Sequence, residues 1–247
     1  MELCCKNLSL VVDFAAGCIT SLIVRGQERL VAKAPLFTIR LRDRAGEAKI
    51  LSIADAKKCT ETKTGALYTD FSGANLSVEV FLTEEQGEAA WRISATPGND
   101  GYFVEWVDFP PITLPKLAEN NPQGTGGKIL FPYNEGVLIS DIDLREGMWM
   151  QHTDAEYPSL GCFTIFPNMV CSQMLAYLWE DAGLYVGAHD EKRSVKEIDF
   201  LKETDGVTLR MRLFCGTDFG QAFAMDYPIV FAATEGHWES AAERYRQ

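Results

Sequence analysis

Apolar and polar residues alternate through the first hundred positions and predict short antiparallel strands. In Phe37–Arg42 the apolar residues fall on one face and Thr38, Arg40 and Arg42 on the other. A period of two is typical of a strand with one buried face. Strands at this spacing favour a large sandwich or barrel. The predicted strands of this half are Leu8–Phe14, Cys18–Val24, Arg29–Val31, Phe37–Arg42, Leu76–Leu82 and Ala90–Ser94.

The pattern stops in a segment rich in proline and glycine and then resumes. We predict that residues 111–135 form a long loop, because the stretch from Pro110 to Pro132 contains five prolines and the run Gly124-Thr125-Gly126-Gly127. Strand patterning of the same kind returns afterwards, which favours a loop inside one sandwich over a linker between two domains. Asp205-Gly206 is a hairpin signal. The later predicted strands are Cys162–Phe166, Ser172–Trp179, Gly183–His189, Lys196–Phe200 and Val207–Phe214.

The hydrophobic period changes only at the end of the chain. Trp238, Ala241, Ala242 and Tyr245 fall at i, i+3, i+4 and i+7, the stripe of an amphipathic helix. A helix of barely two turns is marginal by itself in water, so we expect further chain to follow it. The sequence therefore predicts an all-β fold, a large antiparallel β-sandwich over residues 1–234, with a short C-terminal helix that begins a linker at 235–247.

Composition and charge narrow the classes of partner. The formal net charge is −12 and the pI is about 4.8. Such a surface repels phosphate groups, so we expect no nucleic acid and no anionic membrane as partner, whereas neutral sugars are not disfavoured. The acidity is equally compatible with a role in solubility alone.

Cysteine usage and hydropathy bear on location and cofactors. The seven cysteines form no C-x-x-C pair, and several lie in apolar runs, which favours a reducing compartment. No stretch reaches the length of a membrane helix, and Leu8–Ala16 is interrupted by Asp13, so we expect a cytoplasmic protein. Metal-ligand spacing, a P-loop and a dinucleotide fingerprint are all lacking in the sequence, and we expect no cofactor.

Several stretches of the second half resemble a family of glycosidase-like bacterial proteins. These proteins carry a galactose-mutarotase-like β-super-sandwich ahead of a (β/α) barrel. The most specific stretch is Gly183–Asp190 (GLYVGAHD) between Gln173–Tyr177 and Lys196. Supporting stretches are Val104–Pro110, which resembles the strand entering the central loop, Leu130–Gly136, which resembles its exit, and Tyr227–Val230 with Gly236–Arg246, which resemble the helical passage into the barrel.

The resemblance implies what the chain does and which partner it has. The family includes proteins similar to α-galactosidases and endo-α-N-acetylgalactosaminidases, in which the nucleophile and general acid usually come from the barrel. The chain is then a non-catalytic N-terminal, carbohydrate-associated domain of a glycoside hydrolase. Its partners would be carbohydrate and the C-terminal catalytic domain of the same polypeptide, on which it would pack through Tyr227–Arg246 while the 111–135 loop shapes the substrate cleft.

Two other functions remain open at this stage, an aldose epimerase and a sugar-binding module. An aldose epimerase needs a general acid and a general base on either side of a sugar ring, and His152 and His189 with Asp190 or Glu156 are candidates. The histidine and late glutamate motifs of mutarotases are not evident, however. Asp141 and Asp143 are candidates for a hydrolytic pair, but the sequence equally fits a solvated face.

A sugar-binding module without a barrel is the remaining hypothesis. Trp149, Gln151 and His152 combine an aromatic ring with hydrogen-bonding groups, as a sugar site requires, although Trp149 also suits a core position. His189 and Asp190 either contact a ligand or the barrel, or close a turn through side-chain hydrogen bonds. The candidate substrate-binding residues are thus Trp149, Gln151, His152, His189 and Asp190, and we assign no catalytic or metal-binding residue. Trp106 and Trp179 are expected in the core.

Overall fold

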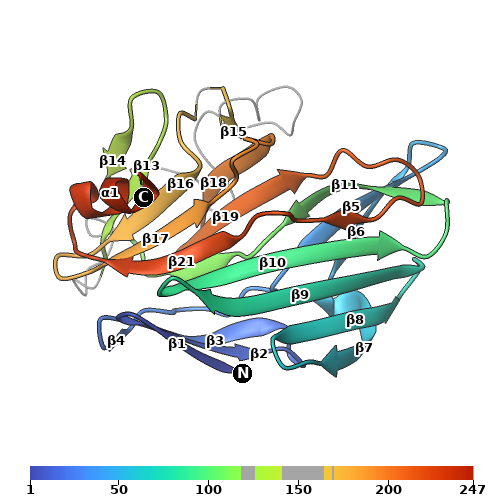
Figure 1. The fold of residues 1–247 in the computed structure, drawn as a ribbon, viewed down its shortest axis with the longest axis horizontal. Helices are drawn as coiled ribbons and strands as arrows, with labels where there is room; N and C mark the ends of the chain where they lie inside the picture. Colours follow the sequence, from blue (N-terminus) through green and yellow to red (C-terminus); the bar gives the residue numbers. More distant parts are fainter. Residues whose placement is uncertain (118–125, 141–163, 169, 247) are drawn as a thin grey trace.

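A computed structural model describes residues 1–117, 126–140, 164–168 and 170–246. Within these residues every strand pairing is antiparallel and the strands form three sheets (Figure 1). The N-terminal sheet has the order β1 (Glu2–Cys5), β2 (Leu8–Asp13), β3 (Cys18–Val24) and β4 (Gln27–Glu28).

Two larger sheets make up most of the described chain. The large sheet has the order β14 (Val137–Ile139), β13 (Lys128–Phe131), β16 (Met174–Leu178), β17 (Gly183–Ala188), β21 (Ile229–Thr234), β10 (Glu88–Pro97), β9 (Leu76–Glu85), β8 (Gly65–Phe71) and β7 (Ala56–Glu61), and β20 (Phe223–Ala224) pairs with β10. The second sheet has the order β15 (Ile165–Phe166), β18 (Lys196–Lys202), β19 (Val207–Phe214), β11 (Tyr102–Asp108), β5 (Thr38–Asp43) and β6 (Ala48–Ser52), and β12 (Ile112–Leu114) pairs with β19. A short 3₁₀ helix, Ile53–Asp55, joins β6 to β7.

One hydrophobic core joins the three sheets. It contains Leu10 of the N-terminal sheet, Val186 of the large sheet and Met211 of the second sheet, all nearly inaccessible to solvent. A smaller core lies on the other face of the large sheet, where Tyr185 points away from the main core. Successive residues of β17 therefore pack into different cores, as the period of two requires.

The C-terminal helix covers this second face. Helix α1 (Trp238–Arg246) contacts β16, β17 and β21, and its Ala241 is fully buried in the smaller core. Figure 1 shows α1 lying beside these strands near β13 and β14. Its last turn is anchored: Arg244 forms an ion pair with the buried Glu88 of β10, and the Tyr245 hydroxyl accepts a hydrogen bond from the Gln173 backbone at 3.2 Å.

The predicted fold class is confirmed, as is the predicted Asp205-Gly206 hairpin. The described chain is an antiparallel all-β sandwich with one short C-terminal helix. Asp205-Gly206 lies in the connection between the paired strands β18 and β19. Glu85-Gln86-Gly87 lies at the β9–β10 hairpin, where Gln86 and Gly87 both have positive φ, the conformation of a two-residue turn that matches strand twist.

Three local predictions are wrong. Residues 111–135, predicted as one long loop, contribute β12 and β13 to the two larger sheets, since short apolar runs there pair with β19 and β16 despite the prolines around them. Arg29–Val31 is not a strand: the Glu28 carboxylate accepts from the Leu22 and Leu30 backbone N–H groups, at 2.9 and 3.0 Å, and the pairing ends at β4. The resemblance of Ile229-Val230 to a helical passage fails too, because both residues lie in the buried strand β21.

Candidate functional site

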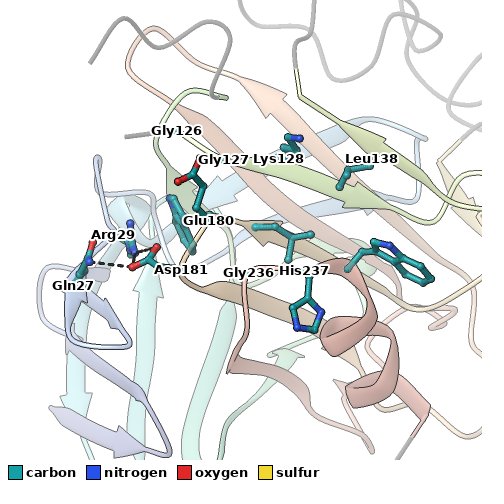
Figure 2. A pocket seen from close by; sticks show the side chains of 13 residues that line it. Gln27, Arg29, Gly126, Gly127, Lys128, Leu138, Glu180, Asp181, Gly236 and His237 are labelled. Atoms are coloured by element: carbon teal, nitrogen blue, oxygen red, sulfur yellow. Dashed lines mark hydrogen bonds and ion pairs between the residues drawn. The ribbon is translucent and has the colours of Figure 1, made fainter. Parts of the chain in front are cut away.

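A cavity of about 750 Å³ opens at one end of the large sheet, where segments far apart in sequence meet (Figure 2). We call it the Trp238 cavity. It is lined by four segments: Gln27 and Arg29 around the end of β4, 126–128 with Leu138 from the β13–β14 hairpin, 178–181 from the β16–β17 turn, and 236–238 at the start of α1. Its volume lies in the range typical of small-molecule sites.

The polar part of the cavity is built around Asp181. Arg29 Nη2 donates to both Asp181 carboxylate oxygens, at 2.8 and 3.0 Å, and Gln27 Nε2 donates to Oδ2 at 3.0 Å. Figure 2 shows these three side chains grouped at one side of the cavity. The Arg29 side chain is 9% exposed whereas that of Asp181 is 50% exposed, so the carboxylate remains open to solvent.

Two aromatic rings, those of Trp179 and Tyr177, pack behind the Arg29 guanidinium. The Arg29 guanidinium lies 4.5 Å from the centre of the buried Trp179 ring, a cation–π contact, and Trp179 packs on Tyr177. Among the described residues, Arg29 Nε and the Trp179 indole N–H are buried and have no hydrogen-bond partner. The buried polar groups beside the cavity therefore keep unused donor capacity.

Tyr177 and two glycines fix the walls. The Tyr177 hydroxyl accepts from the Gly127 N–H and donates to the Pro115 carbonyl, both at 2.8 Å, and burial raises the pKa of this phenol to about 12. A Cβ on Gly127 would lie 2.2 Å from the Leu178 carbonyl oxygen, and one on Gly236 would lie 2.3 Å from the Trp179 carbonyl oxygen. Only glycine allows these segments to approach so closely.

The opposite rim is apolar. Trp238 is 51% exposed and Leu138 is 48% exposed, and both line the cavity. Trp238 belongs to the predicted apolar stripe of the helix, but the stripe is buried only around Ala241, because the first turn of α1 extends past the smaller core. His237, next to it, contacts Glu235 and Glu239 at 3.2 and 3.3 Å.

The predicted residues His189 and Asp190 follow β17 and have different surroundings. The Tyr185 hydroxyl lies 3.3 Å from His189 Nε2, and Glu88 lies 3.8 Å from Nδ1. Burial lowers the pKa of the His189 imidazole, although the negative charge of Glu88 opposes this shift. His189 is therefore neutral at pH 7.

Asp190 is buried and its contacts are those of a turn. It accepts from the Lys192 and Ser194 backbone N–H groups at 2.9 and 2.7 Å and pairs with the fully buried Lys196 at 2.9 Å. Burial raises the pKa of the Asp190 carboxyl, but hydrogen bonding and charge from Lys196 outweigh it and hold this pKa below its usual value. The turn chemistry considered for Asp190 is therefore present in the structure.

The other predicted site residues lie outside the described part of the chain. These are Trp149, Gln151 and His152, together with Asp141, Asp143 and Glu156. Trp106 and Trp179 are buried, as expected. Within the described residues, no group of three or more His, Cys, Asp or Glu side chains is arranged to hold a metal ion, and no helix is long and apolar enough to cross a membrane.

A second polar region lies on the second sheet, on the side facing away from the main core. Two arginines and three carboxylates of β11, β18 and β19 form what we call the charged network: Asp108, Glu197, Asp199, Arg210 and Arg212. Arg210 contacts all three carboxylates within 3.3 Å. Two of the five, Asp108 and Arg210, border a further cavity of about 570 Å³.

Burial dominates the electrostatics of the charged network. The side chains of Asp199 and Arg210 are 1% and 3% exposed. Burial raises the pKa of Asp199 to about 7, against the opposing charge of Arg210. The Arg212 guanidinium lies 3.8 Å from the centre of the Trp106 ring. The network is thus a packed set of ion pairs, and one of its carboxylates titrates near neutral pH.

Comparison with known proteins identifies the fold through structure and not through sequence. No family model matches the chain, and no curated protein does. The whole chain superposes on the α-N-acetylgalactosaminidase NagBb from Bifidobacterium bifidum with a TM-score of 0.66 and 16% identity, and covers 38% of that protein. This level of identity shows a shared fold.

Other carbohydrate enzymes contain the same fold. The GH36 α-galactosidase AgaB from Geobacillus stearothermophilus superposes on 98% of the chain with a TM-score of 0.55 and 8% identity. A polysaccharide lyase superposes on 97% with a TM-score of 0.52 and 9% identity. The chain spans 40% and 34% of these two proteins. In each case it corresponds to well under half of an enzyme that acts on carbohydrate.

Sequence reasoning missed most of the Trp238 cavity. Arg29 and Asp181 are 152 positions apart, and no local pattern links them. One signal was available: Glu180-Asp181 follows Trp179 at a predicted turn, which places polar groups next to an aromatic residue at a strand end. Periodicity places Trp238 on the apolar face of the helix, but it does not show where the sheet that this face packs against ends.

Proposed function

We propose that the chain is a non-catalytic N-terminal domain of a carbohydrate-active enzyme, most simply a glycoside hydrolase, and that it packs on a following (β/α) barrel. The observation that carries this proposal is the match of all or nearly all of the chain to about two fifths of NagBb and AgaB. A fold alone does not fix a function, but the same fold recurs here as one part of several carbohydrate enzymes.

The anchoring of α1 supports a role as a connector. Arg244 and Tyr245 fix the last turn of the helix to β10 and to the segment before β16. A chain leaving such a helix has a defined direction. An adjoining domain would therefore be held in a fixed orientation against the sandwich and would not hang on a flexible linker.

The Trp238 cavity supports a role beside the substrate. It lies at the start of α1, next to the exposed strand β14, and a domain following the helix would be joined at the far end of α1, roughly 13 Å away, a distance that a neighbouring domain spans easily. In this arrangement the segment 111–135, which includes β13, shapes the substrate cleft while the barrel supplies the nucleophile and the general acid. Cleavage of a glycosidic bond needs two suitably placed carboxylates, and the proposal assigns both to the barrel.

Two assays test the proposal. The purified 247-residue chain should not release nitrophenol from nitrophenyl α-N-acetylgalactosaminide or nitrophenyl α-galactoside, whereas the longer product of the same gene should hydrolyse at least one aryl glycoside. The coding sequence beyond Gln247 should encode a barrel of several hundred residues. Hydrolysis of either aryl glycoside by the purified 247-residue chain would contradict the proposal. A stop codon directly after Gln247 would contradict it as well.

A further inference from the structure

The Trp238 cavity combines the two kinds of surface that a sugar ring needs. A pyranose has apolar C–H faces and a rim of hydroxyl groups, so it binds where an exposed aromatic ring faces hydrogen-bonding side chains. Among the large hydrophobic residues that are exposed in the described part of the chain, Trp238 is the aromatic one. Leu138 lies on the same rim of the cavity. Asp181 and Gln27 lie across the cavity from Leu138 (Figure 2).

The charge balance of the lining selects a neutral ligand. Its two cations, Arg29 and Lys128, are matched by two carboxylates, Glu180 and Asp181, and His237 lies between Glu235 and Glu239. Arg29 is already paired with both oxygens of Asp181. An anion would meet a guanidinium whose charge is compensated and a protein of net charge −12.

Hydrogen-bonding capacity remains at the polar side. The Asp181 carboxylate, half-exposed, retains lone pairs that accept from sugar hydroxyls while Arg29 and Gln27 hold its orientation. The Arg29 Nε and Trp179 indole N–H groups next to it are buried, so the Asp181 carboxylate is the group of this cluster that a ligand can reach. Fixed carboxylate geometry on strand ends gives a pre-organised site.

We infer that the Trp238 cavity is a binding site for a neutral saccharide, with Trp238 stacking on a sugar face and Asp181 accepting hydrogen bonds from its hydroxyls. This inference rests on the proposed carbohydrate-related function and assigns it to residues of this chain. The cavity volume of about 750 Å³ accommodates one or two sugar units.

Indole N–H signals in ¹⁵N-edited NMR spectra test the inference on the 247-residue chain. Each tryptophan gives one signal, and Trp238→Ala identifies that of Trp238. Galactose, N-acetylgalactosamine, glucose and raffinose serve as neutral probes up to 20 mM, and galacturonate serves as the anionic probe. We expect at least one neutral probe to shift the Trp238 signal saturably and to shift the Trp179 signal with it. If galactose is that probe, galacturonate should bind at least tenfold more weakly than galactose.

Matched variants separate the site from nonspecific effects. Trp238→Ala should weaken saccharide binding at least tenfold. Trp238→Phe should retain most of the affinity, because an aromatic face remains. Ile50→Ala should leave the affinity unchanged, since Ile50 is an exposed apolar residue that does not line the cavity. Unchanged affinity in Trp238→Ala, no saturable shift with any neutral probe, or equal binding of galacturonate would overturn the inference. A catalytic barrel encoded after Gln247 would leave the proposed function intact even then, so the two failures are distinguishable.

Discussion

The Trp238 cavity and the charged network both combine arginine with carboxylates, but they differ in how far water reaches them. Arg29 pairs with an aspartate that is half-exposed, whereas Arg210 contacts three carboxylates of which Asp199 is almost completely buried. In the first region the carboxylate stays available to a ligand. In the second region the charged side chains pair with one another. Because they are removed from water, the stability of the fold depends on each keeping its partner.

This difference separates a binding surface from a structural one. In the Trp238 cavity only the carboxylate of the ion pair meets water, which screens its charge and leaves it accessible for recognition. A buried set of ion pairs is sensitive to the loss of any member. Substitutions should therefore affect ligand binding in the Trp238 cavity and folding in the charged network.

The largest effect is expected from Arg210→Ala. Loss of the guanidinium leaves the buried Asp199 without its cation and Glu197 with only the longer contact to Arg212 at 3.4 Å, and we expect a loss of about 3–5 kcal/mol in the free energy of unfolding. Urea denaturation followed by far-UV circular dichroism measures it. Arg44→Ala is the matched control, because Arg44 and its partner Asp100 are both well exposed, and it should cost under about 1 kcal/mol. Equal effects in the two variants would remove the distinction between the regions.

A smaller effect should appear as a pH dependence. The pKa of Asp199 is raised to about 7 in the folded state, so the folded chain holds a proton that the unfolded chain has released above its ordinary value of 3.8. The stability that this proton contributes is fully present below pH 3.8 and is lost as the pH rises through 7.

Asp199→Asn isolates this contribution, because other groups such as His189 titrate with the opposite sign. The stability of the wild type relative to the variant should fall by about 1.4 kcal/mol per pH unit, roughly 2–3 kcal/mol between pH 5 and 7. Denaturation curves at half-unit pH intervals give the difference directly. A difference that is constant from pH 5 to 7 would mean that Asp199 has an ordinary pKa in the folded protein.

Gly127→Ala should have a comparable or smaller effect on stability and a clear effect on the cavity. The new Cβ would collide with the Leu178 carbonyl, which is backbone and cannot rotate away, at a cost of about 1–3 kcal/mol. Thermal unfolding measures this cost. Gly101→Ala is the control, since its Cβ would meet only the flexible end of Asn99. If both variants unfold at the same temperature, the close approach of the Gly127 segment to Leu178 is wrong.

The smallest effect on stability is expected from Asp181→Asn. The Asp181 side of the pair is half-exposed, and the asparagine carbonyl still accepts from the buried Arg29 guanidinium, so the substitution should cost about 1 kcal/mol in unfolding free energy. Saccharide binding should nevertheless weaken, since an amide is a poorer acceptor for hydroxyl groups than a carboxylate. Calorimetric unfolding and the NMR titration, applied to one sample, measure both. A large stability loss together with unchanged binding would reverse the roles of the two regions.

The fold was predictable from sequence because its cause is local. A period of two recurs from Leu8 to Phe14 and again in Val207–Phe214, and each repeat reports a strand with distinct faces. Ile229–Thr234 is buried on both faces, lacks this alternation and was not predicted as a strand, whereas the equally buried β16 and β17 were. The strands within 111–135 were missed because prolines outweighed strands of only three and four residues, each with one polar member.

The candidate site was much less predictable because its cause is tertiary. Gly183–Asp190 was selected by resemblance, yet Asp190 closes a turn and is bound to Lys196. The Trp238 cavity forms only when the end of β4, the β16–β17 turn and the start of α1 meet, and the pairing of Arg29 with Asp181 has no sequence signature. Trp179 was correctly placed in the core, but its neighbour Asp181 carries the polar chemistry.

Hydrogen–deuterium exchange with and without a saturating neutral saccharide tests most directly which of the two regions is the binding surface. Ligand should slow exchange in peptides covering 178–181 and 236–238 and leave peptides covering 196–212 unchanged. Protection confined to 196–212 would place binding at the charged network and contradict the division of roles proposed for this domain.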